Sequence, residues 1–117
     1  MVRDYRLYLD DILSAIQSIE EYTQNLVYDD FAKDKKTQDE VVRNLEIIGE
    51  ASNQLPESVR ASAPEIEWRK IVGIRNILAH EYFGVSLPII WDVIQNKLDE
   101  LSSVCLRLLS EAPDFKI

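Results

Sequence analysis

The stretch that decides the fold is residues 37–55, TQDEVVRNLEIIGEASNQL. Its apolar residues recur three and four positions apart, which is the period of one helical face. Thr37, with Glu40 three residues later, has the pattern of a capping box and predicts that a helix starts there. Pro56 predicts the end of this helix, because the residue before a proline is pushed out of the helical region. The apolar stripe consists of Val41, Val42, Leu45, Ile48 and Leu55.

The residues on the N-terminal side of this stretch predict an opening helix over residues 2–27. Residues 29–36 lack periodicity and are predicted to be a connection. On the other side of the stretch, residues 56–63 are predicted to form a short extra turn. The apolar positions of the opening helix are separated by acidic and amide side chains, and they are Tyr5, Tyr8, Leu9, Ile12, Ile16 and Ile19.

The C-terminal half predicts two more long helices. One is expected to begin near Pro64 and to run toward Phe83, with Gly84 as its C-terminal stop. The last is expected to open at Ser86 and to remain helical into residues 108–109. Four long helices joined by short links predict an all-α, up-and-down helical bundle.

Composition supports this fold class and excludes others. The chain has 117 residues, of which 46% are hydrophobic, so we expect one domain over residues 1–117 with a loose C-terminal tail at 110–117. Three glycines and four prolines are too few for a turn-rich β sandwich. The single cysteine, Cys105, excludes an intramolecular disulfide and favours a reducing compartment. No segment resembles a signal peptide or a membrane span, which predicts a cytoplasmic protein without a membrane partner.

The charge distribution is uneven. The formal net charge is −8, which argues against nonspecific coating of nucleic acid. Residues 60–80 nevertheless carry four basic and two acidic groups, and they form the only net-positive stretch of the chain. The basic side chains of this stretch are those of Arg60, Arg69, Lys70 and Arg75.

The polar residues around the only histidine are the candidates for chemistry. His80 is the one side chain that titrates near neutral pH. Helical spacing allows it to share one polar patch with Arg75, Asn76 and Tyr82. Alternatively, Arg75 bridges to an acidic residue of the second helix, and Asn76 and His80 satisfy backbone groups. Arg75 and His80 are offset by about 140° on a straight helix, so two copies facing across a dimer axis would form a better pincer than one.

This pattern resembles a known family. Arg75, Asn76, His80 and Tyr82 match the Arg-x4-His-x-Tyr signature of HEPN-domain toxins of the HepT type, which are paired with an MntA nucleotidyltransferase antitoxin. The likeness extends to residues 8–12, to residues 43–51 (RNLEIIGEA) and to Trp68-Arg69 with Ile71.

The resemblance implies a metal-independent endoribonuclease toxin, built as a homodimer that requires no cofactor. Arg75 would stabilise charge on the phosphate, His80 would transfer protons during attack by the RNA 2′-hydroxyl, and Asn76 would support them by orienting the phosphate or the imidazole. The RNA would be a transfer or messenger RNA, and a basic strip of Arg60, Arg69, Lys70 and Arg75, doubled by dimerisation, would hold it. Tyr82 would receive AMP from the cognate MntA-like nucleotidyltransferase, and this modification would silence the toxin.

Other interpretations of individual residues have less support from the sequence but stay open. Glu46 and Glu50 lie four residues apart and are candidate metal ligands. An ion pair of Glu46 or Glu50 with Arg75 is a simpler interpretation, and Arg43 is expected to pair with Asp39. The aromatic residues Trp68, Trp91, Tyr5 and Tyr8 could stack on bases, or simply pack in the core or an interface. The alternative function is a noncatalytic helical module that binds a nucleotide or a nucleotidyltransferase.

Overall fold

The computed structural model describes the backbone of residues 3–80 and 83–112, and the side chains of residues 3–74 and 87–112. The described residues form helices joined by short links. These helices are α1 (Tyr5–Thr23), α2 (Tyr28–Lys33), α3 (Lys35–Gln54), α4 (Glu57–Ala61), α5 (Trp68–His80), α6 (Phe83–Asn96) and α7 (Leu98–Glu111).

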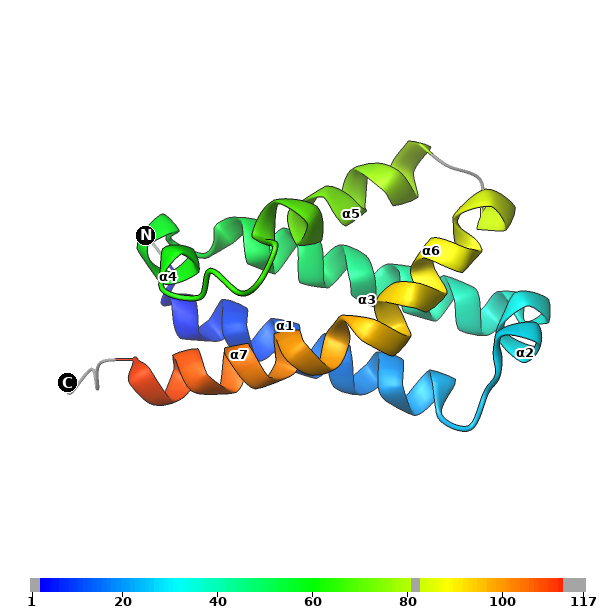
Figure 1. The fold of residues 1–117 in the computed structure, drawn as a ribbon, viewed down its shortest axis with the longest axis horizontal. Coiled ribbons are helices and arrows are strands. Elements are labelled where there is room, and N and C mark those ends of the chain that lie inside the picture. Colours follow the sequence, from blue (N-terminus) through cyan, green and yellow to red (C-terminus); the bar gives the residue numbers. More distant parts are fainter. Residues whose placement is uncertain (1–2, 81–82, 113–117) are drawn as a thin grey trace.

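The long helices form an up-and-down bundle, as the sequence predicts (Figure 1). The first long helix, α1, packs antiparallel to both α3 and α7, and α3 also packs against α5. The fourth column of the bundle consists of α6 followed by α7. The short helix α2 covers the end of the bundle where α3 begins, while α4 lies at the opposite end. The resulting body measures 49 × 28 × 27 Å.

The core lies between α1, α3 and α7 and extends under α5 and α6. It is made of the apolar stripes that helical periodicity predicts. Cys105 is buried within it, and burial raises the pKa of its thiol to about 12. The side chains with almost no exposed surface are Leu9, Ile12, Ile16, Ile19, Phe31, Val41, Leu45, Ile48, Leu55, Leu98 and Leu101.

The structure corrects the prediction for the start of the second long helix. The N-cap of α3 is Asp34, whose carboxylate accepts hydrogen bonds from the Thr37 backbone N–H (3.1 Å) and hydroxyl (2.6 Å). Thr37 therefore lies inside the helix and does not cap it. Residues 29–36, predicted to be a connection, include most of α2. This short helix is stabilised by burial of Phe31 against Trp91, with ring centroids 5.2 Å apart, and by a hydrogen bond from Gln38 Nε2 to the Phe31 carbonyl.

The predicted end of the second long helix is confirmed. Leu55, just before Pro56, has extended backbone angles (φ −64°, ψ 138°), and α3 stops at Gln54. The predicted extra turn after Pro56 is α4.

The boundaries predicted for the C-terminal half need correction. α5 begins at Trp68 and not near Pro64, because the indole of Trp68 donates to the Ala63 carbonyl (3.0 Å) and Arg107 binds the Ser62 carbonyl (3.3 Å). Because these two carbonyl groups bind side chains, the segment between α4 and α5 stays nonhelical. Gly84 lies inside α6 and is not the stop of the preceding helix.

The predicted final helix is interrupted at Lys97, which separates α6 from α7. Its backbone angles, φ −118° and ψ −28°, turn the chain so that α7 aligns with α1. α7 continues to Glu111, two residues into the expected tail, and residues 113–117 lie outside the described part of the chain. None of the helices, as far as they are described, is both long enough and apolar enough to cross a membrane.

Candidate functional site

The last two turns of α5 carry three of the four residues that the sequence singles out. Arg75, Asn76 and His80 lie on the continuous helical backbone of α5, which ends at His80. On an α-helix, five residues advance about 7.5 Å along the axis, so Arg75 and His80 are separated by little more than one turn. Their side chains lie outside the described residues, and so does the whole of Tyr82. The structure therefore places three of these residues on one helix and leaves their mutual contacts untested.

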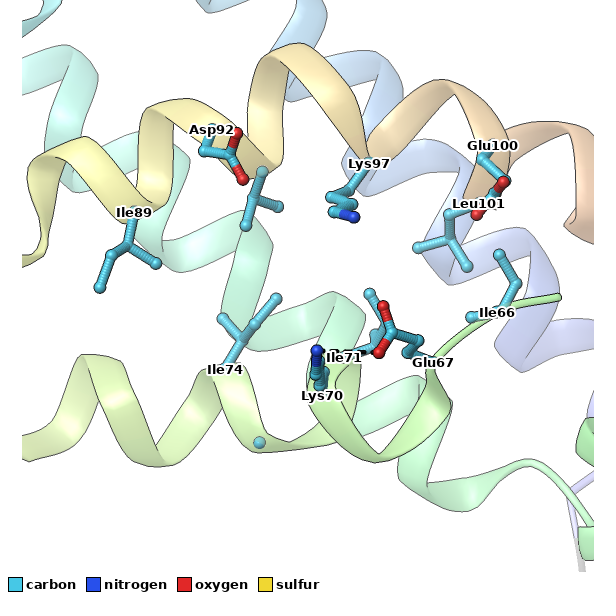
Figure 2. Close-up of a pocket in the computed structure, with 12 residues that line it drawn as sticks. Ile66, Glu67, Lys70, Ile71, Ile74, Ile89, Asp92, Lys97, Glu100 and Leu101 are labelled. Atoms are coloured by element: carbon cyan, nitrogen blue, oxygen red, sulfur yellow. Dashed lines mark ion pairs between the residues drawn. The ribbon is translucent and has the colours of Figure 1, made fainter. Parts of the chain in front are cut away.

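The helix that carries these residues also forms one wall of a groove, which we call the α5–α6 groove (Figure 2). The opposite wall is α6 and the start of α7. The groove has a volume of about 580 Å³. Its walls are largely apolar, through Ile66, Ile71, Ile74, Ile89, Val93 and Leu101, and its charged lining residues are Glu67, Lys70, Asp92, Lys97 and Glu100.

The groove has a distinct order along its length. Ile74, Ile89 and Asp92 lie at the end toward which α5 continues to Arg75, and Lys70 and Lys97 face one another from the two walls near its middle. Lys70 pairs with Glu67 at 2.8 Å, and this hydrogen bond holds the pKa of the Glu67 carboxyl below its usual value, with a smaller contribution from the charge of Lys97.

The sequence analysis assigns no functional role to the groove residues Gly73, Asp92 and Lys97. The features that could have pointed to them are a glycine inside a helical pattern and polar residues that interrupt a long apolar run. The Asn96 amide donates to Asp92 Oδ1 at 2.7 Å, which orients this carboxylate. The other oxygen, Oδ2, has no hydrogen-bond partner within the described part of the chain.

The weaker candidates have mostly structural surroundings. Trp91 packs on Phe31 and meets Tyr28 edge-on, with centroids 6.1 Å apart, while Trp68 is buried. The guanidinium of Arg3 lies 4.7 Å from the centre of the Tyr8 ring. The contacts of the two tryptophans therefore agree with a role in packing.

The charged candidates on α3 are exposed. Glu46 and Glu50 border a shallow depression with Arg43 and Ile47. Asp39 pairs with Lys35 at 3.4 Å, whereas the sequence suggests Arg43 as its partner. Of the predicted basic strip, Arg69 is exposed, Lys70 pairs with Glu67, and Arg60 has a buried Nε with no hydrogen-bond partner among the described residues.

Solved structures share this fold. A crystal structure of a MntA–HepT toxin–antitoxin mutant has a chain that superposes with a TM-score of 0.72 and 22% identity, covering 94% of this chain and all of that one. A second crystal structure, of the toxin–antitoxin with AMP-PNP, gives a TM-score of 0.70 at 22% identity and covers 95% of this chain and 99% of that one. At this level of identity, the likeness establishes the helical architecture.

Sequence comparison is more specific. A probable ribonuclease HepT from Thermococcus cleftensis is 44% identical over 101 residues, which are 86% of this chain and 92% of the relative. The family model for HepT-like ribonucleases matches residues 12–108, a span that includes all of α3, α5 and α6. The chain belongs to the family of HepT-like ribonucleases.

Proposed function

We propose that this protein is the toxin of a toxin–antitoxin pair and acts as a metal-independent endoribonuclease. The observation that carries the proposal is the family match over residues 12–108, which spans the Arg75–His80 segment at the end of α5. The resemblance of two solved toxin–antitoxin chains supports the same architecture. The substrate is a transfer or messenger RNA in the cytoplasm.

The residues of this motif suit RNA cleavage without a metal. The 2′-hydroxyl of RNA attacks the adjacent phosphorus, a base removes its proton, and an acid protonates the departing 5′-oxygen. His80 is the only imidazole of the chain, so one subunit supplies one proton-transfer group at the motif. In a homodimer with facing motifs, His80 acts as the base and the partner subunit's His80 as the acid. The products are a 2′,3′-cyclic phosphate and a 5′-hydroxyl end.

Arg75 and Asn76 complete the site. A guanidinium offers forked donors to two phosphate oxygens, so Arg75 neutralises the charge that builds up in the transition state. Asn76 lies next to it on α5 and orients the phosphate or the imidazole. No metal or cofactor takes part in the proposed reaction.

Regulation acts at Tyr82. We assign the antitoxin role to an MntA-like nucleotidyltransferase, which transfers AMP from ATP to the Tyr82 hydroxyl and releases pyrophosphate. The added phosphate then lies two residues beyond His80 and occupies the anion site that RNA would use. The modified toxin no longer binds its substrate productively.

The test is incubation of purified unmodified protein with total cellular RNA in EDTA, followed by sequencing of the RNA ends. His80→Ala is assayed beside it, and Gln95→Ala, at an exposed position of α6, is the matched control. We expect the wild type and the control to produce cyclic phosphate ends at defined sites and the His80 variant to produce none.

The alternative function, a noncatalytic module that binds a nucleotide or partner, predicts a different result. Unmodified protein would then cleave no RNA, and His80→Ala would weaken binding to the nucleotidyltransferase while the fold persists. A structural role alone would lower the stability of His80→Ala and Arg75→Ala without changing cleavage. Mass spectrometry of the intact protein, before the assay, verifies that Tyr82 carries no AMP.

A further inference from the structure

The size of the α5–α6 groove limits what can occupy it. Its volume of about 580 Å³ lies within the range of about 300–1,000 Å³ that is typical of pockets for small ligands. An α-helix with its side chains is about 10–12 Å wide, so about one turn of a whole helix would already fill this space. The groove is therefore suited to a ligand of one or two nucleotides.

Gly73 shows that space inside the groove is left open. It lies in the middle of α5, where glycine is less favourable than alanine. A Cβ placed at this position would have none of the described atoms within 4 Å, so packing inside the subunit does not account for the glycine. The missing side chain keeps this wall of the groove accessible to a group that enters from outside.

The two ends of the groove offer different chemistry. At the end nearest the motif, Ile74 on α5 faces Ile89 on α6, and Ile89 is 50% exposed. Val93 of α6 also lines the groove. Flat aromatic bases pack well between such apolar walls. Farther along, Lys70 and Lys97 provide two ammonium groups. The Lys70–Glu67 pair is exposed on both sides, so its net stabilisation is small and Lys70 can exchange it for a phosphate.

Asp92 provides the selectivity. Its Oδ1 is held by Asn96, and its Oδ2 can accept a hydrogen bond from a ligand. An ionised carboxylate only accepts, so it favours bases that carry an exocyclic amino group, cytosine being the usual partner. Uracil carries no exocyclic amino group, and its single donor, N3–H, lies between two carbonyl oxygens that the carboxylate would repel.

We propose that the α5–α6 groove is a nucleobase subsite, which binds one base of the RNA and prefers an amino-bearing base over uracil. Ile74, Ile89 and Val93 enclose the base, Asp92 accepts from its amino group, and Lys70 with Lys97 binds the neighbouring phosphate. This inference rests on the proposed ribonuclease function, because it takes the ligand of the groove to be RNA.

The test separates binding from cleavage. Fluorescence anisotropy measures binding of labelled tricytidylate and triuridylate to His80→Ala protein, in which the groove is intact and cleavage is absent. We expect tricytidylate to bind about tenfold more tightly. Adding Asp92→Asn should remove most of this preference, and Gly73→Leu should weaken binding of both by about tenfold, since its side chain fills the groove. Asp10→Asn makes the same exchange as Asp92→Asn, and Gln95→Leu likewise introduces a leucine. Both positions are exposed and outside the groove, so both affinities should stay unchanged.

Other outcomes overturn the proposal. Equal affinity for the two trinucleotides, or a preference that survives Asp92→Asn, shows that the groove does not read the base. If Gly73→Leu instead separates a dimer into monomers and leaves affinity for RNA unchanged, the groove belongs to an interface between copies. A further outcome separates the two proposals. If the wild type cleaves no RNA, but tricytidylate still binds more tightly and Asp92→Asn removes this preference, the proposed ribonuclease function is wrong and the nucleotide site is supported.

Discussion

Thr37 donates two hydrogen bonds to Asp34 at the start of α3: the Asp34 carboxylate accepts from both the backbone N–H and the hydroxyl of Thr37, at 3.1 and 2.6 Å. The hydrogen bond from the Thr37 side chain is the main reason that the pKa of Asp34 lies below its usual value. A single acidic residue thus satisfies a free donor at the start of the helix that carries most of the core contacts.

Removal of this cap should lower stability. Asp34→Ala loses both hydrogen bonds to Thr37, and we expect the melting temperature to fall by a few degrees. Because the folded-state pKa of Asp34 is depressed, its contribution is present above the unfolded-state pKa and is lost as the pH falls through the folded-state pKa. Thermal melts followed by circular dichroism should therefore differ between wild type and variant at pH 7 and converge in strong acid. A difference that persists unchanged in strong acid would contradict this assignment.

Phe31 should be the most important side chain of α2. It has no exposed surface and packs against Trp91, so Phe31→Ala leaves a cavity and should lower the free energy of unfolding by about 3–5 kcal/mol. Val27→Ala, at a position that is 62% exposed beside the same helix, should change it by no more than about 0.5 kcal/mol. Urea denaturation of the two variants makes the comparison, and similar midpoints would show that α2 is not anchored by this ring.

Gly73→Ala should stabilise the protein. Alanine has the higher helix propensity, and its Cβ would meet none of the described atoms within 4 Å, so we expect a gain of about 0.5–1 kcal/mol. Urea denaturation of the purified variant measures this gain. A loss of stability would mean that another group, from a second copy or from the undescribed residues, lies against this position.

Cys105 should be unreactive while the protein is folded. Its thiol is buried in α7, and burial raises its pKa to about 12, so the reactive thiolate is scarce at neutral pH. An alkylating reagent at pH 7.5 should label it only after unfolding in urea, as followed by intact mass. Rapid labelling of native protein would show that α7 separates from α1 on the timescale of the experiment.

Arg75→Lys should impair cleavage although the positive charge is kept. Lysine cannot donate to two phosphate oxygens in the forked geometry of a guanidinium, and we expect kcat to fall about a hundredfold. The matched control is Arg43→Lys, at an exposed position of α3, which should retain wild-type kcat. Initial rates on a short RNA provide the measurement, and equal rates for Arg75→Lys and wild type would mean that only charge is needed there.

Much of the architecture can be predicted from the sequence, because long helices show a clear periodicity of apolar residues. The stripes of α1 and α3 repeat over five turns each, and Pro56 ends α3 by a local steric effect. The wrong predictions concern segments whose conformation depends on contacts with residues far away in the sequence. The six residues of α2 are too few to show a period, and they are helical because Phe31 and Gln38 tie them to the bundle. Similarly, Trp68 and Arg107 hold the segment before α5 out of a helix.

The sequence by itself determined the helical class, the order of the long helices and the Arg75–His80 motif, since periodicity, proline stops and residue chemistry are local properties. Only the tertiary structure decided that the last apolar run breaks at Lys97, and that α6 and α5 enclose a groove beside the motif. A helix that must pack against α5 along one part and against α1 along the next cannot remain straight. The angle between such helices depends on side chains far apart in the chain, and no local pattern encodes it.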